Sequence, residues 1–403
     1  MTEVLGESLS AALEGQRILA ISGSNFSGRT DVLRKFSESA EGRVYIGPEV
    51  HNSLSGLATS VRQEIELHCS ASLESSGAMK GVEELQLADL LDQNPGLLSG
   101  GEQACLAVLC GWVLWPEYLA IDCALEQLDS HRLARTIQLL NEGDSPKRGT
   151  AATDNRLDEW PITVKTVPVA ELNPNPAAPP VPPLNPEALT ALSPISAPSI
   201  AMQAVAAGYR RRPGVLRELS FAMEGGKTHV LLGPNGAGKS TTAKILCGVL
   251  RPSSGEIRFG DEIARPWKSP GRVVGYHLQN PDVGLFESTV LTELTVGGDA
   301  KRAEIVLEAF GLRPVAQSNP LSLPFPVRKR VSLAATIAGR QPWLFLDEPT
   351  LGFDAAGIAA LAKMIQILAD KGHGVIVVSH SQTFRMMVGG TRWTMDAGKV
   401  LGN

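Results

Sequence analysis

The stretch "LLGPNGAGKSTT", Leu231 to Thr242, decides the fold of this chain. It follows an apolar run that predicts a strand and it opens a predicted helix, the context in which a glycine pattern is typical of a phosphate-binding loop. Backbone N–H groups and the helix N-terminus would bind phosphates, Lys239 would bring charge to the β and γ phosphates, and Ser240 would ligate magnesium. The residues expected to contact a nucleotide are Gly233, Pro234, Asn235, Gly236, Ala237, Gly238, Lys239, Ser240 and Thr241.

A second chemical signal lies further along, in "WLFLDEPTLGFD", Trp343 to Asp354. Its apolar run predicts a buried strand that ends at Asp347 and Glu348. Asp347 would hold magnesium, directly or through water, and Glu348 would orient and polarise an attacking water. Together with the loop, this carboxylate pair predicts a site that hydrolyses a nucleotide.

The first half of the chain repeats the same order of features. An apolar strand, a glycine loop "GSNFSGRT" (Gly23 to Thr30), a helix and a later strand "YLAID" (Tyr118 to Asp122) follow one another. Apolar runs suit strands buried on both faces, and strands alternating with helices predict a doubly wound α/β fold. We therefore expect two domains, 1–172 and 201–403. The proline-dense residues 173–200 predict a semi-rigid extended linker between them.

Composition and charge exclude several classes of protein. The 403 residues include 37 Lys and Arg against 42 Asp and Glu, a net charge of −5, which offers no basic surface for nucleic acid. The longest apolar run is too short for a membrane span, and the acidic start "MTEVLGESLS" lacks the features of a secretory signal. The five cysteines form no CxxC pair, so we expect reduced, mostly buried thiols in a cytoplasmic protein.

Further motifs give the second half a family resemblance. "YHLQNP" contains Gln279 and "VVSHS" contains His380, and from Ala201 to Asn403 this half resembles the ATP-binding-cassette (ABC) ATPases. The resemblance implies two P-loop NTPase domains that use ATP and Mg²⁺. It also implies that Gln279 is the Q-loop residue, catalytic and a magnesium ligand, and that His380 is the switch histidine. Asp354 would lie in the D-loop, and Tyr209 would stack on adenine.

One motif of this family is missing from the second half. Where the signature Leu-Ser-Gly-Gly-Gln should precede "KRVSLA", the chain has "LPFPV", Leu323 to Val327. A signature binds the γ phosphate of ATP held by an opposing domain, through a serine and bare glycine amides at a helix start. Pro324 and Pro326 have no N–H to donate, so this segment is predicted to be unable to bind ATP.

The first half has the opposite pattern of losses. Arg29 replaces the loop lysine, Cys123 replaces the catalytic glutamate, and Asp154 is predicted to stand in place of the switch histidine. A guanidinium is not equivalent to an ammonium in a tight loop, and a neutral thiol polarises water poorly. The predicted degenerate site consists of Gly23, Gly28, Arg29, Thr30 and Asp122.

The signature, however, is intact in "LLSGGEQ", Leu97 to Gln103. Ser99 followed by Glu102 is also an ordinary capping box at a helix start, and both interpretations can hold at once. Gly100 and Gly101 favour a signature, because two glycines weaken a first turn and need a reason such as the close approach of a ligand. Ser99, Gly100, Gly101 and Glu102 are therefore predicted to contact ATP.

Domains of the resembled family work as head-to-tail pairs, with each ATP between the loop of one domain and the signature of the other. This rule explains why one half has lost its signature and the other half has lost its loop lysine and catalytic glutamate. The second half's loop with the first half's signature would complete one competent site, whereas pairs of identical halves would complete none. We expect pairing within the chain. The second, degenerate site would not cleave nucleotide, and whether it retains one through Thr30 and Asp122 stays open.

The segment "LQNPDVGLFESTVLTEL", Leu278 to Leu294, resembles the partner-docking region of energy-coupling-factor (ECF) ATPases. Glu293 and, in the first half, Glu64 match its acidic helix. The resemblance implies an importer of vitamins or transition-metal ions, held at the inner face of the cell membrane by a transmembrane scaffold and a substrate-binding membrane subunit. The alternatives are a soluble tandem ABC ATPase that acts on ribosomes or in repair, and a scaffold that ATP merely gates.

Overall fold

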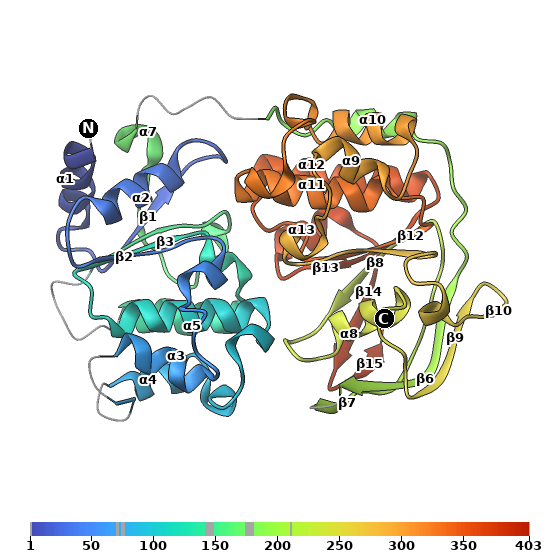
Figure 1. Cartoon of the computed structure of the whole chain (residues 1–403), viewed down its shortest axis with the longest axis horizontal. Coiled ribbons are helices and arrows are strands. Elements are labelled where there is room, and N and C mark those ends of the chain that lie inside the picture. The colour runs from blue at the N-terminus through green and yellow to red at the C-terminus, as the bar shows by residue number, and fades with distance from the viewer. Residues whose placement is uncertain are drawn as a thin grey trace. The chain divides into compact units, whose positions relative to one another are not determined.

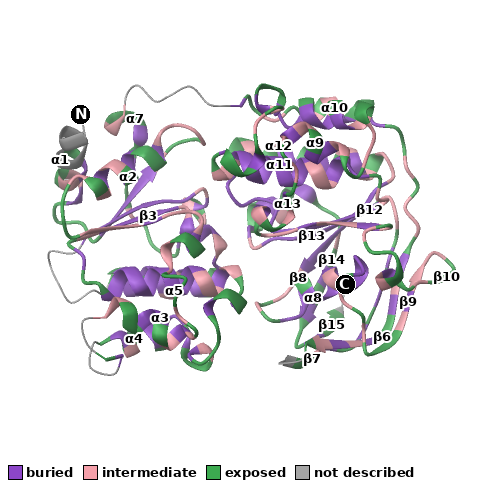
Figure 2. Cartoon of the chain, in the orientation of Figure 1, coloured by how far each residue is buried: buried purple, intermediate pink, exposed green. Residues whose placement is uncertain are grey.

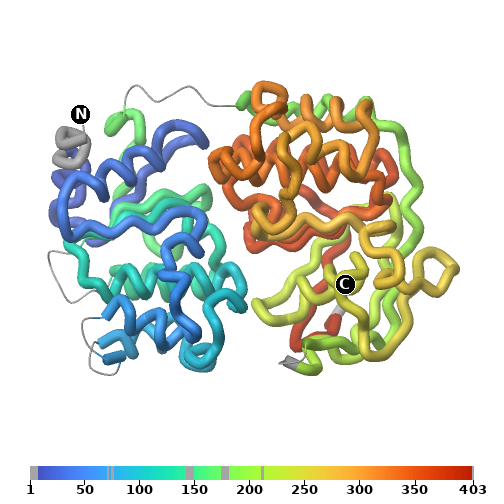
Figure 3. Tube along the Cα trace, in the orientation of Figure 1, coloured from blue at the N-terminus to red at the C-terminus, as the bar shows by residue number. Residues whose placement is uncertain are grey.

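The computed structural model describes residues 2–69, 72–73, 77–141, 149–173, 181–209 and 212–402. The chain divides into two units, Met1–Pro179 and Pro180–Asn403, each of which is described by itself (Figures 1 and 3). Part of the predicted linker, residues 174–180, lies outside the described residues. No helix in the described part of the chain is both long and apolar enough to cross a membrane.

Unit 1 is built on a five-stranded parallel sheet with the strand order β2-β3-β4-β1-β5. Its strands are β1 (Ile18–Ser22), β2 (Arg43–Ile46), β3 (Tyr118–Asp122), β4 (Gly149–Thr153) and β5 (Lys165–Pro168). Its helices are α1 (Thr2–Leu13), α2 (Arg29–Glu38), α3 (Val61–His68), α4 (Ala78–Glu84), α5 (Gly100–Val113), α6 (Ser130–Asn141) and α7 (Val169–Leu172).

Both faces of this sheet are covered, as the apolar runs predict. Ile18 and Ile121 pack into a core with α5, whereas Leu19 and Ile21 pack into a second core with α1 and α2. Successive side chains of a strand point to opposite faces of the sheet, so a strand without polar residues packs apolar side chains into a core on each face. Figure 2 shows the buried residues of β3 and α5.

Unit 2 contains two sheets. A six-stranded sheet has the order β11-β12-β13-β8-β14-β15, and a four-stranded antiparallel sheet has the order β10-β9-β6-β7. The strands are β6 (Ile200–Tyr209), β7 (Arg212–Met223), β8 (Thr228–Leu232), β9 (Ser254–Phe259), β10 (Glu262–Ile263), β11 (Val274–His277), β12 (Trp343–Asp347), β13 (Gly374–Val378), β14 (Thr391–Asp396) and β15 (Lys399–Gly402). The helices are α8 (Lys239–Leu246), α9 (Val290–Thr295), α10 (Ala300–Ala309), α11 (Phe325–Ala338), α12 (Ala355–Asp370) and α13 (Gln382–Val388).

The order β2-β3-β4-β1-β5 in unit 1 corresponds strand by strand to β11-β12-β13-β8-β14 in unit 2. The duplication seen in the sequence is therefore a duplication of topology. Among the described residues, unit 1 has no counterpart of the antiparallel sheet, and α1 packs against α2, β1 and β4. The first unit is thus a reduced version of the second.

Much of the predicted linker belongs to unit 2. Residues 181–199, which we call the strap, lie against α10 and α12, and Val181, Leu189 and Leu192 are buried. The strap includes a 3₁₀ helix, Pro186–Ala191, and on either side of it prolines favour an extended backbone, which forms no regular internal hydrogen bonds. Side chains of unit 2 bond to carbonyls of the strap: Arg330 donates to Pro182 O at 2.6 Å and Trp343 Nε1 to Pro198 O at 2.6 Å. The sequence did not predict this packing.

Candidate functional site

The glycine loop of unit 2 connects β8 to α8, as the sequence predicts. Gly233 and Gly238 have φ angles of 143° and 102°, which favour glycine. A Cβ on Gly233 would lie 2.2 Å from the carbonyl oxygen of Met395, and one on Gly238 would lie 2.4 Å from Leu216. The loop therefore needs glycine at both positions. Helix α8 begins at Lys239, so its free N–H groups adjoin the loop.

Two residues at the start of α8 carry the loop's chemistry. Lys239 Nζ donates to the carbonyls of Gly233 and Pro234, at 2.7 and 2.9 Å, which holds the amine over the loop. Ser240 Oγ donates to Asp347 Oδ2 at 2.8 Å. The structure thus brings together the loop hydroxyl and the strand-end carboxylate that the sequence assigns to magnesium.

Asp347 has a second donor that the sequence analysis missed. The hydroxyl of Tyr276, on β11, donates to the same Oδ2 atom at 3.1 Å. Burial and the neighbouring Glu348 raise the pKa of Asp347, and the bonds from Ser240 and Tyr276 oppose that rise. Burial and the charge of Asp347 also raise the pKa of Tyr276, so its hydroxyl stays protonated and donates.

Glu348 follows β12 in a strained left-handed conformation, with φ at 46°. Its N–H donates to Val378 O at 2.9 Å, and its Oε2 accepts from the N–H of His380 at 3.2 Å. His380 Nε2 lies 3.5 Å from Oε1. Oε1 is buried and accepts no hydrogen bond from the described residues. The structure thus places Glu348 and His380 side by side, and their catalytic roles stay predictions.

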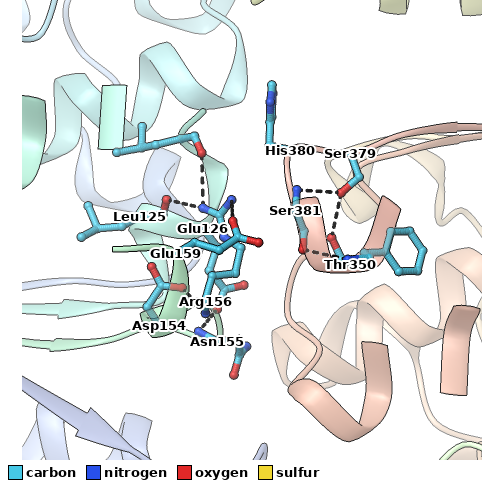
Figure 4. Close-up of polar contacts among 12 residues, drawn as sticks. Leu125, Glu126, Asp154, Asn155, Arg156, Glu159, Thr350, Ser379, His380 and Ser381 are labelled. Atoms are coloured by element: carbon cyan, nitrogen blue, oxygen red, sulfur yellow. Dashed lines mark hydrogen bonds and ion pairs between the residues drawn. The ribbon is translucent and has the colours of Figure 1, made fainter. Parts of the chain in front are cut away.

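The loop that carries His380 is fixed by its neighbours. Ser379 Oγ lies 3.4 Å from Thr350 Oγ1 and accepts from the N–H of Ser381 at 3.2 Å, as Figure 4 shows. Both serines are buried. This anchoring leaves the half-buried imidazole of His380 beside the glutamate.

Three other predicted residues of unit 2 have clear local positions. Tyr209, at the end of β6, has its hydroxyl 3.4 Å from Thr241 Oγ1, and Lys244 Nζ lies 5.3 Å from the centre of its ring. The ring therefore adjoins the loop helix. Asp354 caps α12 by accepting from Gly357 N at 2.9 Å. Gln279 is half-buried and follows β11 closely.

The two signature positions differ as predicted. In unit 1, Ser99 caps α5: its N–H and Oγ both bond to Glu102 Oε2 at 2.8 Å, and Glu102 N donates back to Ser99 Oγ. The capping box is thus confirmed, and Ser99 itself is exposed. In unit 2, α11 begins after Pro324 without a side-chain cap. Of these two helix starts, α5 has a serine and two glycines, whereas α11 has prolines.

The loop of unit 1 is altered at two positions. Phe26 occupies the place of Gly236 and has a φ of 61°, which is unusual for a bulky residue. Arg29 is buried, and its guanidinium donates to Asn25 Oδ1 at 3.3 Å and to Asn155 Oδ1 at 2.7 Å. Unlike Lys239, it does not turn back to loop carbonyls but bridges the loop to the end of β4.

The strand ends of unit 1 have the backbone geometry of those in unit 2 but different side chains. Asp122 accepts from Thr153 Oγ1 at 2.5 Å and from the Tyr45 hydroxyl at 3.0 Å, in place of a loop hydroxyl. Cys123 has the same left-handed backbone as Glu348, with φ at 52°. Burial, with help from Glu126 and Asp122, raises the pKa of the Cys123 thiol well above its usual range. A thiol held neutral in this way cannot act as a base.

The predicted counterpart of the switch histidine needs a correction. Counted from the aligned strand ends, Thr153 corresponds to Val378, so Asn155 and not Asp154 corresponds to His380. Asp154 is buried and accepts from Arg156 N at 2.7 Å and Trp160 Nε1 at 3.0 Å. Figure 4 shows this turn, in which Asn155 N also donates to Glu126. The error arose because sequence spacing fixes strand ends only to within a residue or two.

The acidic helix positions also need a correction. Glu293 is buried and accepts from the N–H groups of Phe286 and Glu287, both at 2.8 Å. Glu64 is buried and accepts from the N–H and hydroxyl of Ser55 at 2.5 and 2.7 Å. Each carboxylate stabilises the loop before its own helix, so neither is presented to a partner. Phe286, in the loop before α9, is exposed over 83% of its surface.

The cysteines agree with the expectation of reduced thiols. All are free, and Cys105, Cys110 and Cys247 are buried. Burial raises the pKa of Cys105 and of Cys247 to about 12.

With this geometry established, comparison with known proteins identifies the class. The family model described as "ABC transporter" matches residues 216–351. A putative ABC transporter ATP-binding protein of Pyrococcus horikoshii is 35% identical over 184 residues, 43% of this chain and 70% of the relative. The chain therefore belongs to the ABC transporter ATP-binding family, whose members hydrolyse ATP.

Two further relatives have more specific names. The energy-coupling factor transporter ATP-binding protein EcfA of Methanocaldococcus jannaschii is 33% identical over 200 residues, 46% of this chain and 72% of the relative. A putative HMP/thiamine import ATP-binding protein of Bacillus subtilis is 25% identical over 350 residues, 74% of this chain and 64% of the relative.

Solved structures show that the fold likeness extends to both units. The structure titled "Model of ribosome-bound archaeal Pelota and ABCE1" has a TM-score of 0.69 at 18% identity and covers 95% of this chain and 74% of that chain. The RNase-L inhibitor has a TM-score of 0.62 at 17% identity and covers 95% and 85%. At such identities the likeness concerns the fold alone, which is that of P-loop NTPase (ABC ATPase) domains.

Proposed function

We propose that this chain is the ATP-hydrolysing subunit of an ECF-like ABC importer and that unit 2 holds its catalytic residues. The observation that carries the proposal is the set around Glu348. A buried carboxylate oxygen that accepts no hydrogen bond, beside an imidazole, is suited to hold and polarise a water molecule. The loop, Lys239 and the start of α8 would bind the phosphates, and Tyr209 would stack on the base.

The residues present also fit magnesium. A serine hydroxyl and an aspartate carboxylate within 2.8 Å of each other are the oxygen ligands that this ion takes. Ser240, Asp347 and Gln279 would hold it, and the ion would neutralise phosphate charge. Tyr276 would keep the Asp347 carboxylate in the orientation that the ion needs.

The signature for this site would come from unit 1. The complementarity of the two units supports this proposal. Unit 1 has the signature residues Ser99, Gly100, Gly101 and Glu102 but no glutamate at the position of Glu348. Unit 2 has Glu348 but no signature. We propose that the two predicted domains, 1–172 and 201–403, the second extended by the strap, pair within the chain around one competent ATP site.

The remaining loop, in unit 1, would hold no nucleotide. Arg29 is tied to Asn155, and Asp122 already accepts hydrogen bonds from Thr153 and Tyr45. A phosphate would have to displace the guanidinium, and Asp122 is bonded to the hydroxyl of Thr153 where Asp347 is bonded to the loop hydroxyl of Ser240. We assign unit 1 the role of signature donor and scaffold.

The names of two relatives favour transport over the ribosomal or repair alternative. EcfA and the Bacillus subtilis protein are described as transport or import subunits, whereas the ABCE1 likeness is one of fold. The exposed Phe286 and Val283, next to the Q-loop, are suited to bind an apolar segment of a membrane subunit. Membrane attachment through such a scaffold, together with a substrate-binding subunit, is part of the proposal. Hydrolysis that drives transport also separates it from a scaffold merely gated by ATP.

The substitution Glu348→Gln tests the catalytic assignment. It keeps the size of the side chain but removes the base, so steady-state ATP hydrolysis by the full chain should fall roughly a hundredfold or more. Nucleotide affinity, measured with a fluorescent ATP analogue, should change little.

Glu304→Gln on the exposed face of α10 is the matched control and should hydrolyse ATP at the wild-type rate. Substantial hydrolysis by the Glu348→Gln variant would refute the assignment. Co-purification with a polytopic membrane protein would support the transport role, whereas ribosomal material would support the alternative.

A further inference from the structure

Lys329 is a fully buried lysine on α11, close to the catalytic residues. Burial lowers its pKa to about 7, although Glu348 and Asp347 partly oppose this. Taking an amine out of water is costly unless acceptors replace the solvent. The position therefore calls for an explanation other than packing.

The amine has three acceptors that belong to functional segments. Lys329 Nζ lies 2.9 Å from the carbonyl oxygen of Gln279, 3.5 Å from that of Glu348 and 3.2 Å from His277 Nε2. It thus contacts the backbone of the Q-loop and the backbone of the strained glutamate at once. The contact to Glu348 is the longest, and it adds to the bond from Glu348 N to Val378 O.

The imidazole of His277 completes the arrangement. His277 is fully buried, and its Nε2 atom lies 3.2 Å from Lys329 Nζ. If Nε2 accepts from Lys329, then Nδ1 carries the hydrogen and donates to Ser332 Oγ at 3.1 Å. Lys329 and Ser332 lie on the same face of α11, so the helix binds the strand before the Q-loop at two points.

A neighbouring contact binds the other end of the same segment. Arg328 Nε donates to Asp282 Oδ1 at 2.8 Å. The first turns of α11 therefore contact the segment Gln279–Asp282 at both of its ends.

We propose that Lys329 is a positioning residue for ATP hydrolysis: it fixes the backbone of Gln279 to that of Glu348, so that both side chains are oriented together. This inference rests on the catalytic role proposed for Glu348. Helix α11 would thus keep a function in unit 2, although the signature motif at its start is lost.

Unit 1 supports the inference. When "LSGGEQA" is aligned with "LPFPVRK", Ala104 occupies the position of Lys329. In that unit Cys123 replaces the catalytic glutamate. The lysine therefore occurs only where there is a glutamate to position.

The substitution Lys329→Met tests the proposal in the full chain. It keeps the length of the buried side chain but removes every donor, so kcat for ATP should fall tenfold or more. The KM for ATP should stay within about twofold, because none of the phosphate or base contacts involve Lys329. Lys329→Gln, which can still donate to two carbonyls, should recover most of kcat.

Three comparisons make the result decisive. Lys301→Met, on the exposed face of α10, should leave kcat unchanged. Wild-type kcat in Lys329→Met would overturn the inference, as would a KM and a melting temperature that change in step with kcat, since these indicate a general structural defect. If Glu348→Gln is inactive while Lys329→Met is fully active, only this inference fails. If Glu348→Gln stays active, the proposed function fails.

Discussion

At the scale of single residues, the two units place different chemistry on the same backbone positions. Glu348 and Cys123 both follow a strand with a left-handed φ, of 46° and 52°, and both donate their N–H to the neighbouring strand. Backbone geometry is thus preserved where catalytic chemistry is not. The strain at this position therefore belongs to the fold, and of the two positions only the one in unit 2 carries a glutamate.

A tyrosine that binds the strand-end aspartate also occurs in both units. Tyr276 contacts Asp347 at 3.1 Å and Tyr45 contacts Asp122 at 3.0 Å. Tyr276→Phe removes one hydrogen bond to a charged group, worth about 1.5 kcal/mol, so the Mg²⁺ concentration for half-maximal ATP hydrolysis should rise about tenfold. Tyr45→Phe is the matched control, because unit 1 is proposed not to bind magnesium. A Mg²⁺ titration of nucleotide binding gives the same comparison without turnover. Equal effects of the two substitutions would contradict the separate roles.

At the scale of elements, the strap shows how a proline-rich segment can be structural. Ile195 N donates to Lys371 O at 2.8 Å and Ala197 N donates to Gly372 O at 3.1 Å, so the strap pairs with the turn after α12. This pairing needs glycine, because a Cβ on Gly372 would lie 1.9 Å from Ile195 O. The strap is thus part of the folded unit over residues 181–199.

Gly372→Ala should therefore destabilise unit 2 by roughly 2–4 kcal/mol, from backbone strain together with displacement of the strap. Urea unfolding of the full chain measures this. Gly271→Ala provides the comparison: its φ is also positive, at 70°, but a Cβ there meets no atom within 4 Å. It should cost only about 1 kcal/mol from the left-handed backbone. Equal losses for the two variants would indicate that the strap contributes nothing.

At the scale of the whole molecule, the proposal is one competent ATP site for two homologous units. Unit 2 has the loop lysine, the glutamate and the histidine, and unit 1 has the intact signature. Neither unit alone has a complete set. The duplication would thus have led to specialisation of each copy.

This asymmetry predicts the stoichiometry of binding. With Mg²⁺ and a non-hydrolysable ATP analogue, calorimetry should give about one nucleotide per chain, because the unit 1 loop lacks the lysine and its Arg29 is bound to Asn155. Lys239→Ala should abolish that binding, since the loop of unit 2 would then lack the positive charge that attracts the phosphates. Two nucleotides per wild-type chain, or one remaining after Lys239→Ala, would show that the unit 1 loop also binds.

Local signals predicted much of this molecule from the sequence. The glycine loops, the apolar strands with terminal carboxylates and the capping box at Ser99 each depend on a few adjacent residues, and the structure has them where expected. The same signals in both halves predicted the duplication. Elements specified by short patterns can be found without knowing what they pack against.

Contacts across the fold were decided only by the tertiary structure. Tyr276 and Lys329 act on residues far away in the sequence, Asn155 corresponds to His380 only once the strands are paired, and the strap packs because unit 2 offers it donors. The sequence indicated that Glu293 is available to a partner, but in the structure its carboxylate accepts a hydrogen bond from the loop before its own helix. The sequence by itself determined the fold, the family and the loop, because these follow from local patterns. Which side chains support, neutralise or block one another depends on distances that folding alone sets.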